Sequence, residues 1–278
     1  MTLTYPLHDL ALSFRALHVP GRPLVLPNAW DPVSAAVLVE AGAPAVATTS
    51  AGLAWALGAA DGDRLDRDRA LAAVARIAEA VRGVAVSADI EGGYAEDAAG
   101  VADTVRAAVV AGVVGVNIED GRHGGGGEPL RPVAEQAERI AAARAAAGSA
   151  RVPLFVNARI DTFLRDAGGV EPTLERAAAY LAAGADGIFV PGAVDPGTVK
   201  ALVAGIDAPV NVLVGPGAPA VAEFAALGVA RISAGSSIAE AAHALVRRAA
   251  RELLREGTYG ALAGGFAYGE LNALLTRA

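Results

Sequence analysis

One phrase recurs along the chain and constrains its fold more than any other feature. It consists of an alanine-rich stretch, a glycine, and a short apolar run that ends in polar residues, and it occurs at residues 40–50, 110–120, 182–191 and 226–233. In each copy the glycine stands where a helix C-cap is expected, immediately before a strand. The phrase therefore predicts helices that alternate with short buried strands.

Four more strands fit between these copies, at residues 23–28, 84–91, 153–160 and 209–214. Each of the eight strands is followed by a helical segment. The clearest predicted helices span residues 67–81, 96–111, 134–147 and 171–183. Apolar strands that alternate with helices predict a parallel sheet that is covered on both faces.

Eight such units in a chain of 278 residues predict a (β/α)8 TIM barrel. A doubly wound open sheet is the alternative, but no G-x-G-x-x-G follows the first strand. Because no linker divides the chain, we expect residues 1–278 to form a single barrel domain. Residues 253–278 lie beyond the eighth unit, and we expect this helical extension to pack on a neighbouring subunit.

The composition argues against several classes of function. A formal net charge of −7, without blocks rich in lysine or arginine, argues against a nucleic-acid partner. With no cysteine, the chain has no disulfide, no thiolate zinc site and no cysteine nucleophile. Its single lysine, Lys200, lies in a predicted helix rather than at a strand end, which argues against Schiff-base catalysis.

Neither a secretory signal nor a membrane span is expected. Residues 1–19 carry His8, Asp9 and Arg15 among their apolar residues, unlike a signal peptide. The chain also has no run of about 20 uncharged apolar residues. We therefore expect a soluble, cytoplasmic protein without a membrane partner.

Acidic residues concentrate after the third, fourth and fifth strands, at the carboxyl ends where barrel enzymes place their sites. Asp89 and Glu91 are two residues apart on one strand, so their side chains point to the same face, and Glu119 ends the neighbouring strand. Hard oxygen ligands favour Mg²⁺ or Mn²⁺ over zinc. Alternatively, these carboxylates cap the following helices or pair with arginines at the rim.

Other polar groups at the strand ends are candidates for anion binding. Arg159 ends the fifth strand and could hold a carboxylate or an oxyanion in bidentate fashion; its alternative, a compatible one, is an ion pair with Glu119 or Asp161. The turn at residues 49–52 offers backbone N–H groups at a helix start, although an ordinary N-cap is the better interpretation of this turn taken alone. Asn211, on the seventh strand, is a further candidate for substrate binding.

Two loops are candidates for gating the site. Residues 59–64 carry Asp61 and Asp63, and residues 121–128 carry His123 beside four consecutive glycines. Such a glycine run has little intrinsic order and suits a lid that closes on a substrate; alternatively, it is a disordered surface loop. His123 is the only histidine predicted near the rim, which makes it an acid–base candidate.

Six motifs follow one another along most of the chain. They are Leu26-Pro-Asn-Ala-Trp-Asp31, Thr49-Ser-Ala-Gly-Leu53, Leu57-Gly-Ala-Ala-Asp61, Ser87-Ala-Asp-Ile-Glu-Gly-Gly-Tyr94, Gly115-Val-Asn-Ile-Glu-Asp120 and Asn157-Ala-Arg-Ile-Asp161. In this order and spacing, the motifs resemble the isocitrate lyase/phosphoenolpyruvate mutase superfamily. The resemblance implies a (β/α)8 barrel whose last helix is swapped between subunits, usually in a tetramer. We therefore expect a homo-oligomer, either a tetramer or a dimer.

The resemblance also implies Mg²⁺-dependent chemistry on 2-oxo or 2-hydroxy acids through a pyruvate-type enolate. By matching motifs, Asp89, Glu91 and Glu119 hold Mg²⁺, partly through water, and Asp89 also lies at the substrate. Asp61 is the catalytic-loop aspartate. The residues implied to hold the substrate's carboxylate and oxo oxygen are Ser50, Ala51, Gly52, Leu53 and Arg159.

One departure from the superfamily leaves the subfamily open. Its lyases carry a cysteine as general acid in the loop after the fourth strand, in a Lys-Lys/Arg-Cys-Gly-His sequence, and the mutase and phosphonopyruvate hydrolase branch carries Thr-Asn-Ser there. Residues 121–128 contain neither sequence.

These observations predict a Mg²⁺-dependent, lyase-like enzyme that cleaves a C–C bond in a small 2-oxo or 2-hydroxy acid. Two other reactions stay open, namely an oxaloacetate-type decarboxylation and the hydrolysis of the P–C bond of phosphonopyruvate. A protein that binds a 2-oxo acid without catalysis is the alternative from another class, and the absence of a recognisable acid in the glycine-rich loop favours it.

Overall fold

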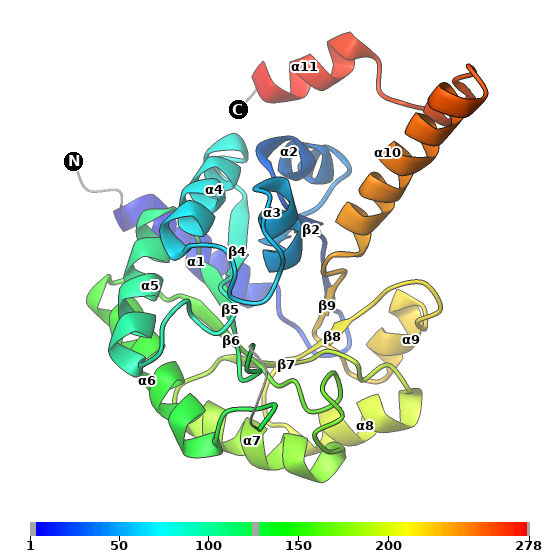
Figure 1. The fold of residues 1–278 in the computed structure, drawn as a ribbon. Coiled ribbons are helices and arrows are strands. Elements are labelled where there is room, and N and C mark those ends of the chain that lie inside the picture. Colours follow the sequence, from blue (N-terminus) through cyan, green and yellow to red (C-terminus); the bar gives the residue numbers. More distant parts are fainter. Residues whose placement is uncertain (1–3, 124–127, 277–278) are drawn as a thin grey trace.

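In the computed structural model, which describes residues 4–123 and 128–276, a parallel sheet curls into a ring with helices outside it (Figure 1). The strand order is β1-β9-β8-β7-β6-β5-β4-β3-β2. The strands are β1 (Leu24–Leu26), β2 (Asn28–Ala29), β3 (Ala45–Thr48), β4 (Ala85–Asp89), β5 (Gly115–Glu119), β6 (Phe155–Arg159), β7 (Gly187–Val190), β8 (Val210–Leu213) and β9 (Arg231–Ser233).

The first two strands are consecutive halves of one barrel strand, separated by Pro27. β1 pairs with β9 on one side, and β2 pairs with β3 on the other. Proline cannot donate a ladder hydrogen bond, so the strand exchanges one neighbour for the other at this residue. The ring is thereby closed, and the predicted (β/α)8 barrel is confirmed.

Helices connect successive strands and cover the outside of the barrel. They are α2 (Pro32–Glu40), α3 (Ser50–Ala56), α4 (Arg67–Ala80), α5 (Ala98–Val110), α6 (Val133–Ser149), α7 (Val170–Ala182), α8 (Pro196–Gly205) and α9 (Val221–Ala226), whereas α10 (Ser237–Arg255) follows the last strand. Four of the predicted helices agree with α4, α5, α6 and α7 to within about two residues at each end.

The glycines of the recurring phrase occupy the predicted position. They are Gly42, Gly112, Gly184 and Gly228, with φ angles of +97°, +93°, +106° and +89°. Each follows a helix and precedes β3, β5, β7 or β9. Because side chains disfavour positive φ, glycine is the residue that ends these helices and turns the chain into the barrel.

The amino end of the barrel is closed by α1 (Thr4–Ala16), which packs against β4 and β6. After this helix, the ring of His18 stacks on Phe155 at the start of β6, with ring centroids 3.9 Å apart, and meets Phe14 edge-on. The His18 Nδ1–H donates to the Phe14 carbonyl at 2.9 Å, whereas the buried Nε2 has no hydrogen-bond partner among the described residues. An apolar, aromatic floor therefore lies beneath the barrel.

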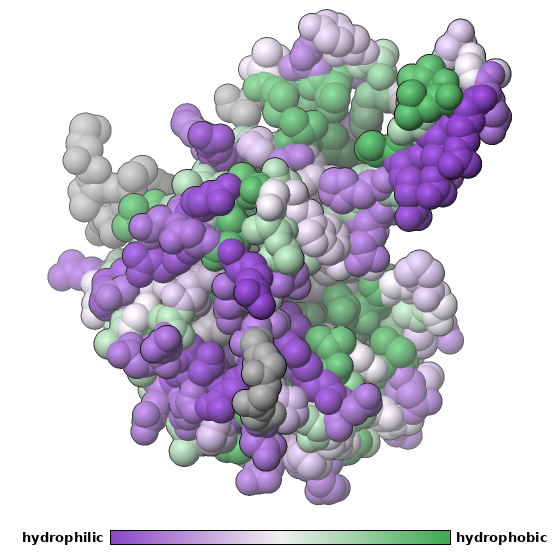
Figure 2. Space-filling model, viewed as in Figure 1, coloured by the Kyte–Doolittle hydropathy of each residue, from purple (hydrophilic) through white to green (hydrophobic). Residues whose placement is uncertain are grey.

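The chain beyond β9 stands away from the barrel. α10 projects outward, and after the short helix η1 (Gly260–Leu262) the final helix α11 (Tyr268–Thr276) returns to α2 (Figure 1). Large apolar side chains are exposed along this segment, among them Val246, Leu254 and Phe266, and apolar surface gathers there (Figure 2). No described helix is both long and apolar enough to cross a bilayer.

His18 gives the stability of the fold a pH dependence of definite sign. Burial lowers the pKa of His18 to about 3, from 6.5 in the unfolded chain. Between these values the unfolded chain binds the additional proton, so the stabilisation by the neutral ring is complete above pH 6.5 and is lost as the pH falls. From pH 7 to pH 5 the free energy of unfolding should drop by about 2 kcal/mol through this group.

Denaturant unfolding at the two pH values measures this loss. His18→Gln should shrink the difference between pH 7 and pH 5 by about that amount, whereas His243→Gln, at an exposed position on α10, should not change it. An unchanged pH difference in the His18 variant would contradict the assignment.

Candidate active site

Three of the side chains predicted for the site end neighbouring strands at one rim of the barrel. Asp89 ends β4, Glu119 ends β5 and Arg159 ends β6. In the strand register Glu119 lies opposite Arg159, and Asp89 lies opposite Asn117. Because all strands run parallel, their carboxyl ends meet at the same rim, where the sites of barrel enzymes lie.

An ion cluster holds Arg159 in place. Its Nη1 lies 2.6 Å from Glu119 Oε2, and its Nε and Nη2 donate to the two carboxylate oxygens of Asp161 at 2.7 and 3.1 Å. Burial opposes the charged guanidinium, but these carboxylates outweigh it and raise the pKa of Arg159. The internal ion pair considered from the sequence is therefore present, and Arg159 stays positively charged.

A second layer of polar groups fixes this cluster from outside. The Asp161 N–H donates to Asp120 Oδ1 at 2.9 Å, and Asp120 Oδ2 accepts from Arg176 at 3.0 Å and from the Tyr180 hydroxyl at 2.9 Å. Asp120 and Asp161 have no exposed surface. Buried polar groups that are all hydrogen-bonded in this way rigidify their surroundings.

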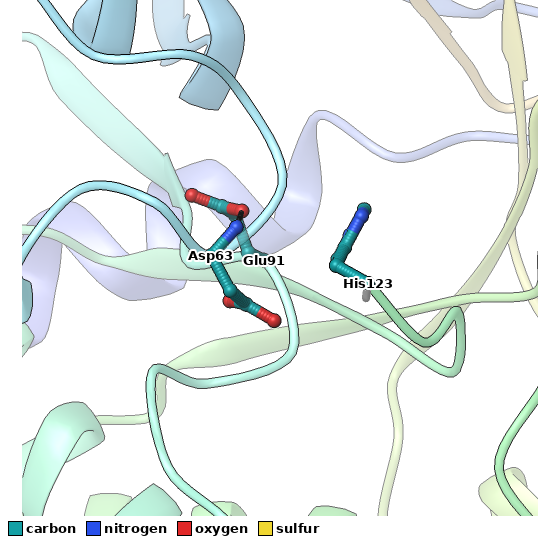
Figure 3. A group of neighbouring side chains, drawn as sticks. All are labelled: Asp63, Glu91 and His123. Atoms are coloured by element: carbon teal, nitrogen blue, oxygen red, sulfur yellow. Dashed lines mark hydrogen bonds between the residues drawn. The ribbon is translucent and has the colours of Figure 1, made fainter. Parts of the chain in front are cut away.

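Asp63, Glu91 and His123 form a second group at the rim (Figure 3). One potential ligand atom from each lies within 4.8 Å of the others. The Asp63 N–H donates to Glu91 Oε2, and His123 Nε2 contacts Glu119 Oε1, which links this group to the Arg159 cluster. Asp63 and His123 line a polar cleft of about 770 Å³. The predicted loops at residues 59–64 and 121–128 thus supply residues to one place, although residues 124–127 of the proposed glycine lid lie outside the described residues.

Three of the five non-glycine residues with positive φ in the described structure belong to this second group or follow it closely in sequence. Asp63, Glu91 and Tyr94 have φ angles of +57°, +50° and +50°, in the left-handed region that side chains disfavour. Such conformations persist only where the surrounding structure enforces them, and they cluster at functional sites. The strain therefore supports a functional role for the loops that carry Asp63 and Glu91.

The carboxylates of the rim differ in their electrostatic state. Burial raises the pKa of Asp89 to about 6 and that of Glu91 to about 7, and the nearby charge of Asp61 adds to both shifts. Burial also acts on Glu119, but Arg159 and His123 outweigh it and hold its pKa below the ordinary value. The hydrogen bond to Glu119 raises the pKa of His123.

These shifts test whether the residues fit a divalent cation. Asp89 accepts a hydrogen bond from the Ser50 hydroxyl at 3.1 Å, and neither Asp89 nor Glu91 forms an ion pair with an arginine among the described residues. Burial raises both pKa values, and at Asp89 it outweighs the opposing charge of Arg159. Carboxylates in this state are suited to hold a cation. Both oxygens of Glu119 are already engaged, one by His123 and one by Arg159.

The remaining sequence-predicted residues occupy different depths of the barrel. Residues 50–53 are buried in the first turn of α3, and Thr49 Oγ1 caps that turn by accepting the Gly52 N–H at 3.4 Å. Asn211 is buried and hydrogen-bonded to Ser233. Asp61 is exposed, and its charge is felt at Asp89 and Glu91.

Sequence reasoning missed an arginine inside the barrel. Arg231 opens β9 and has no exposed surface. Its Nε lies 3.3 Å from Ser233 Oγ and its Nη2 donates to Asn117 Oδ1 at 3.2 Å, whereas Nη1 has no hydrogen-bond partner among the described residues. Burial lowers the pKa of Arg231 to about 9. Its only sequence signal was the two-residue spacing from Ser233, which directs both side chains into the barrel.

A closed (β/α)8 barrel with carboxylates, a histidine and a charged arginine at the carboxyl ends of its strands has the architecture of a barrel enzyme. The chain belongs to the phosphoenolpyruvate phosphomutase family, because the profile of that family matches residues 14–254. Members of the wider phosphoenolpyruvate mutase/isocitrate lyase superfamily are lyases or mutases that act on C–C or P–C bonds. The superfamily resemblance seen in the sequence is thereby confirmed.

Three comparisons illustrate this membership. An uncharacterised protein of Mycobacterium tuberculosis is 42% identical over 227 residues, which is 81% of this chain and 82% of that protein. The crystal structure of a putative lyase/mutase from Burkholderia cenocepacia has a TM-score of 0.90 and 38% identity, with 96% of each chain covered. The structure of oxaloacetate acetylhydrolase with the inhibitor 3,3-difluorooxalacetate has a TM-score of 0.86 and 26% identity, covering 97% of this chain and 94% of that one.

Arg231 should lower the stability of the barrel, because it has no carboxylate partner among the described residues. We expect Arg231→Met to raise the free energy of unfolding by about 1–3 kcal/mol, since it removes a buried charge and retains most of the side-chain volume. Denaturant unfolding at pH 7 measures the change. Arg231→Lys keeps the charge and should give no such gain. A loss of stability in the methionine variant would show that the hydrogen bonds to Ser233 and Asn117 outweigh the cost of burial.

Proposed function

We propose that the chain is a Mg²⁺-dependent, lyase-like enzyme that cleaves a C–C bond in a 2-oxo or 2-hydroxy carboxylic acid through a pyruvate-type enolate. The observation that carries the proposal is the shared rim. A charged arginine, Arg159, lies there beside the carboxylates of Asp89, Glu91 and Glu119 and the imidazole of His123. Family membership supports the same class of chemistry.

Asp89, Glu91 and Glu119 are the proposed metal ligands, with Mn²⁺ as a substitute for Mg²⁺. The raised pKa values of Asp89 and Glu91 support a cation there, and Asp63 offers a further oxygen ligand within reach of Glu91. A bound Mg²⁺ supplies positive charge next to a developing enolate oxygen. Because Glu119 is engaged on both oxygens, its proposed contact to the metal runs through water.

Arg159 is proposed to hold the substrate's carboxylate. A guanidinium carries five N–H donors, and the described contacts of Arg159 to Glu119 and Asp161 use three of them. Two N–H groups therefore remain for a ligand. The turn at residues 50–53 and Asn211 complete the proposed substrate-binding set, and Asp61 stands on the loop that lies over the site.

His123 is proposed as the group that moves a proton. Its Nδ1 lies 3.2 Å from Nη2 of Arg165, which can only donate, so Nδ1 accepts and Nε2 carries the proton toward Glu119. In the lyases of the superfamily that the sequence resembles, the loop that follows the fourth strand carries the general-acid cysteine. His123 lies in the corresponding loop of this chain, after β5, and its imidazole has a proton to give.

The subunit organisation is inferred from the segment that follows β9. We propose that residues 1–278 form one domain and that α10 and α11 pack on a neighbouring copy in a homo-oligomer. The exposed apolar side chains of this segment, such as Leu254 at 82% exposure, support it.

Oxaloacetate is a favoured candidate substrate, because the chain resembles oxaloacetate acetylhydrolase over nearly its whole length.

The first test of the function is NMR of the protein with a panel of acids, each with Mg²⁺ and with a chelator. The panel contains oxaloacetate, phosphonopyruvate, 2-methylisocitrate, dimethylmalate and 2-oxoglutarate. We expect a Mg²⁺-dependent oxo acid product from one of them, and loss of that turnover in Arg159→Ala. Binding without product would favour a non-catalytic binder, release of phosphate would favour P–C hydrolysis, and neither binding nor turnover would overturn the proposal.

Mg²⁺ affinity should decrease as the pH is lowered, because a carboxylate must be deprotonated to bind a metal. With pKa values of about 7 for Glu91 and about 6 for Asp89, both groups are ionised at pH 8, whereas at pH 6 Glu91 is largely protonated and Asp89 is half protonated. We expect at least about tenfold weaker binding at pH 6 than at pH 8 by isothermal titration calorimetry. An affinity that does not change between these pH values would contradict the ligand assignment of Glu91.

A further inference from the structure

Arg165 lies in a rigid turn directly after β6. Its backbone N–H donates to the Asp161 carbonyl at 2.9 Å, and the Ala167 N–H donates to the Thr162 carbonyl at 2.8 Å. Gly192 packs so closely against this turn that a Cβ there would lie 3.1 Å from the Leu164 nitrogen. The turn therefore holds the base of the Arg165 side chain in a fixed position at the rim.

The guanidinium of Arg165 is poorly satisfied by the protein. Nη2 donates to His123 Nδ1 at 3.2 Å. Nε lies 3.7 Å from Asp161 Oδ2, beyond hydrogen-bond distance, and has no other partner in the described structure. Of five N–H donors, one is used by His123 and the Nε–H is buried, which leaves the three remaining Nη hydrogens for a ligand. The side chain is 29% exposed, so a solute can reach it.

Four nearby arginines are paired with carboxylates more closely. Arg122 and Arg131 share Glu135, at 2.9 and 2.8 Å. Arg176 lies 3.0 Å from Asp120, and Arg159 is held by two carboxylates. Asp161 is already bonded to Arg159 through both of its oxygens. Among these five arginines, Arg165 has the weakest carboxylate partner within the described ranges.

Arg165 also lies next to the proposed catalytic residues. It contacts His123, which in turn contacts Glu119, and it approaches Asp161 Oδ2, which lies 3.1 Å from Arg159 Nη2. Two guanidinium groups are thus held near one buried carboxylate at the mouth of the barrel. An anion that bridges them would satisfy Arg159 at one end and Arg165 at the other.

We infer that Arg165 is a specificity-determining residue that binds an acidic group at the far end of the substrate. This inference rests on the proposed function, in which Arg159 holds the carboxylate beside the reacting carbon. The substrate is then an oxo or hydroxy acid with a second carboxylate, and a monocarboxylic acid leaves the Arg165 guanidinium without its partner. A guanidinium fork matches a carboxylate in bidentate fashion, which makes the contact selective as well as attractive.

The test compares two ligands of the Mg²⁺-loaded protein by isothermal titration calorimetry. 3,3-Difluorooxaloacetate carries the distant carboxylate, and oxalate is the compact ligand without it. We expect Arg165→Met to weaken difluorooxaloacetate binding at least about tenfold, as loss of a charged hydrogen bond predicts. Oxalate binding should stay within about twofold. Arg165→Lys should restore part of the loss, and Arg122→Met, which removes an arginine paired with Glu135, is the matched control.

Each other outcome counts against the inference in a distinguishable way. An equal loss for both ligands would mean that Arg165 acts through His123 or through the fold, and an unchanged affinity for both would mean that it touches neither. In both cases the proposed function survives, because the unsubstituted protein binds both ligands. If the unsubstituted protein binds neither ligand, the proposed function fails and the inference fails with it.

Discussion

The ion cluster around Arg159 is the interaction on which the rest of the site depends. Arg159 and Glu119 lie opposite each other on β6 and β5, and Asp161 holds the guanidinium from the other side. Removing one partner from such a buried cluster leaves an uncompensated charge and typically costs about 3–5 kcal/mol. The position of His123 follows from this cluster, because its ring contacts the oxygen of Glu119 that Arg159 does not use.

The carboxylates of Asp89 and Glu91, beyond this cluster, form no ion pair in the described structure. This excess of negative charge enables the rim to bind a cation. Glu91 is buried, Asp89 is partly buried, and the backbone of Glu91 is held at positive φ. Such features lower stability and are tolerated where the rest of the fold over-determines them. The apolar layer between the sheet and its helices, together with the aromatic floor at Phe155, provides that surplus.

Much of the site was predictable because parallel strands have one direction. Once the glycine-punctuated phrase and the apolar runs between its copies had located the strands, Asp89, Glu119 and Arg159 had to meet at the same rim. Local chemistry also predicted the turn before α3, where Thr49 forms an N-cap. The sequence could not distinguish between the two roles of Arg159, an internal ion pair and substrate binding, because both require the same residue at the same position.

The sequence by itself determined the barrel, since the period of apolar runs and the glycines at positive φ are local properties of the chain. Only the tertiary structure decided which side chains are neighbours across it. Asp63 reaches Glu91 through the path of a loop, Arg165 reaches His123 across two loops, and Arg231 reaches Asn117 across the barrel interior. These contacts join residues 28 to 114 positions apart. No local pattern encodes such separations, because they depend on how the ring closes and where each loop returns.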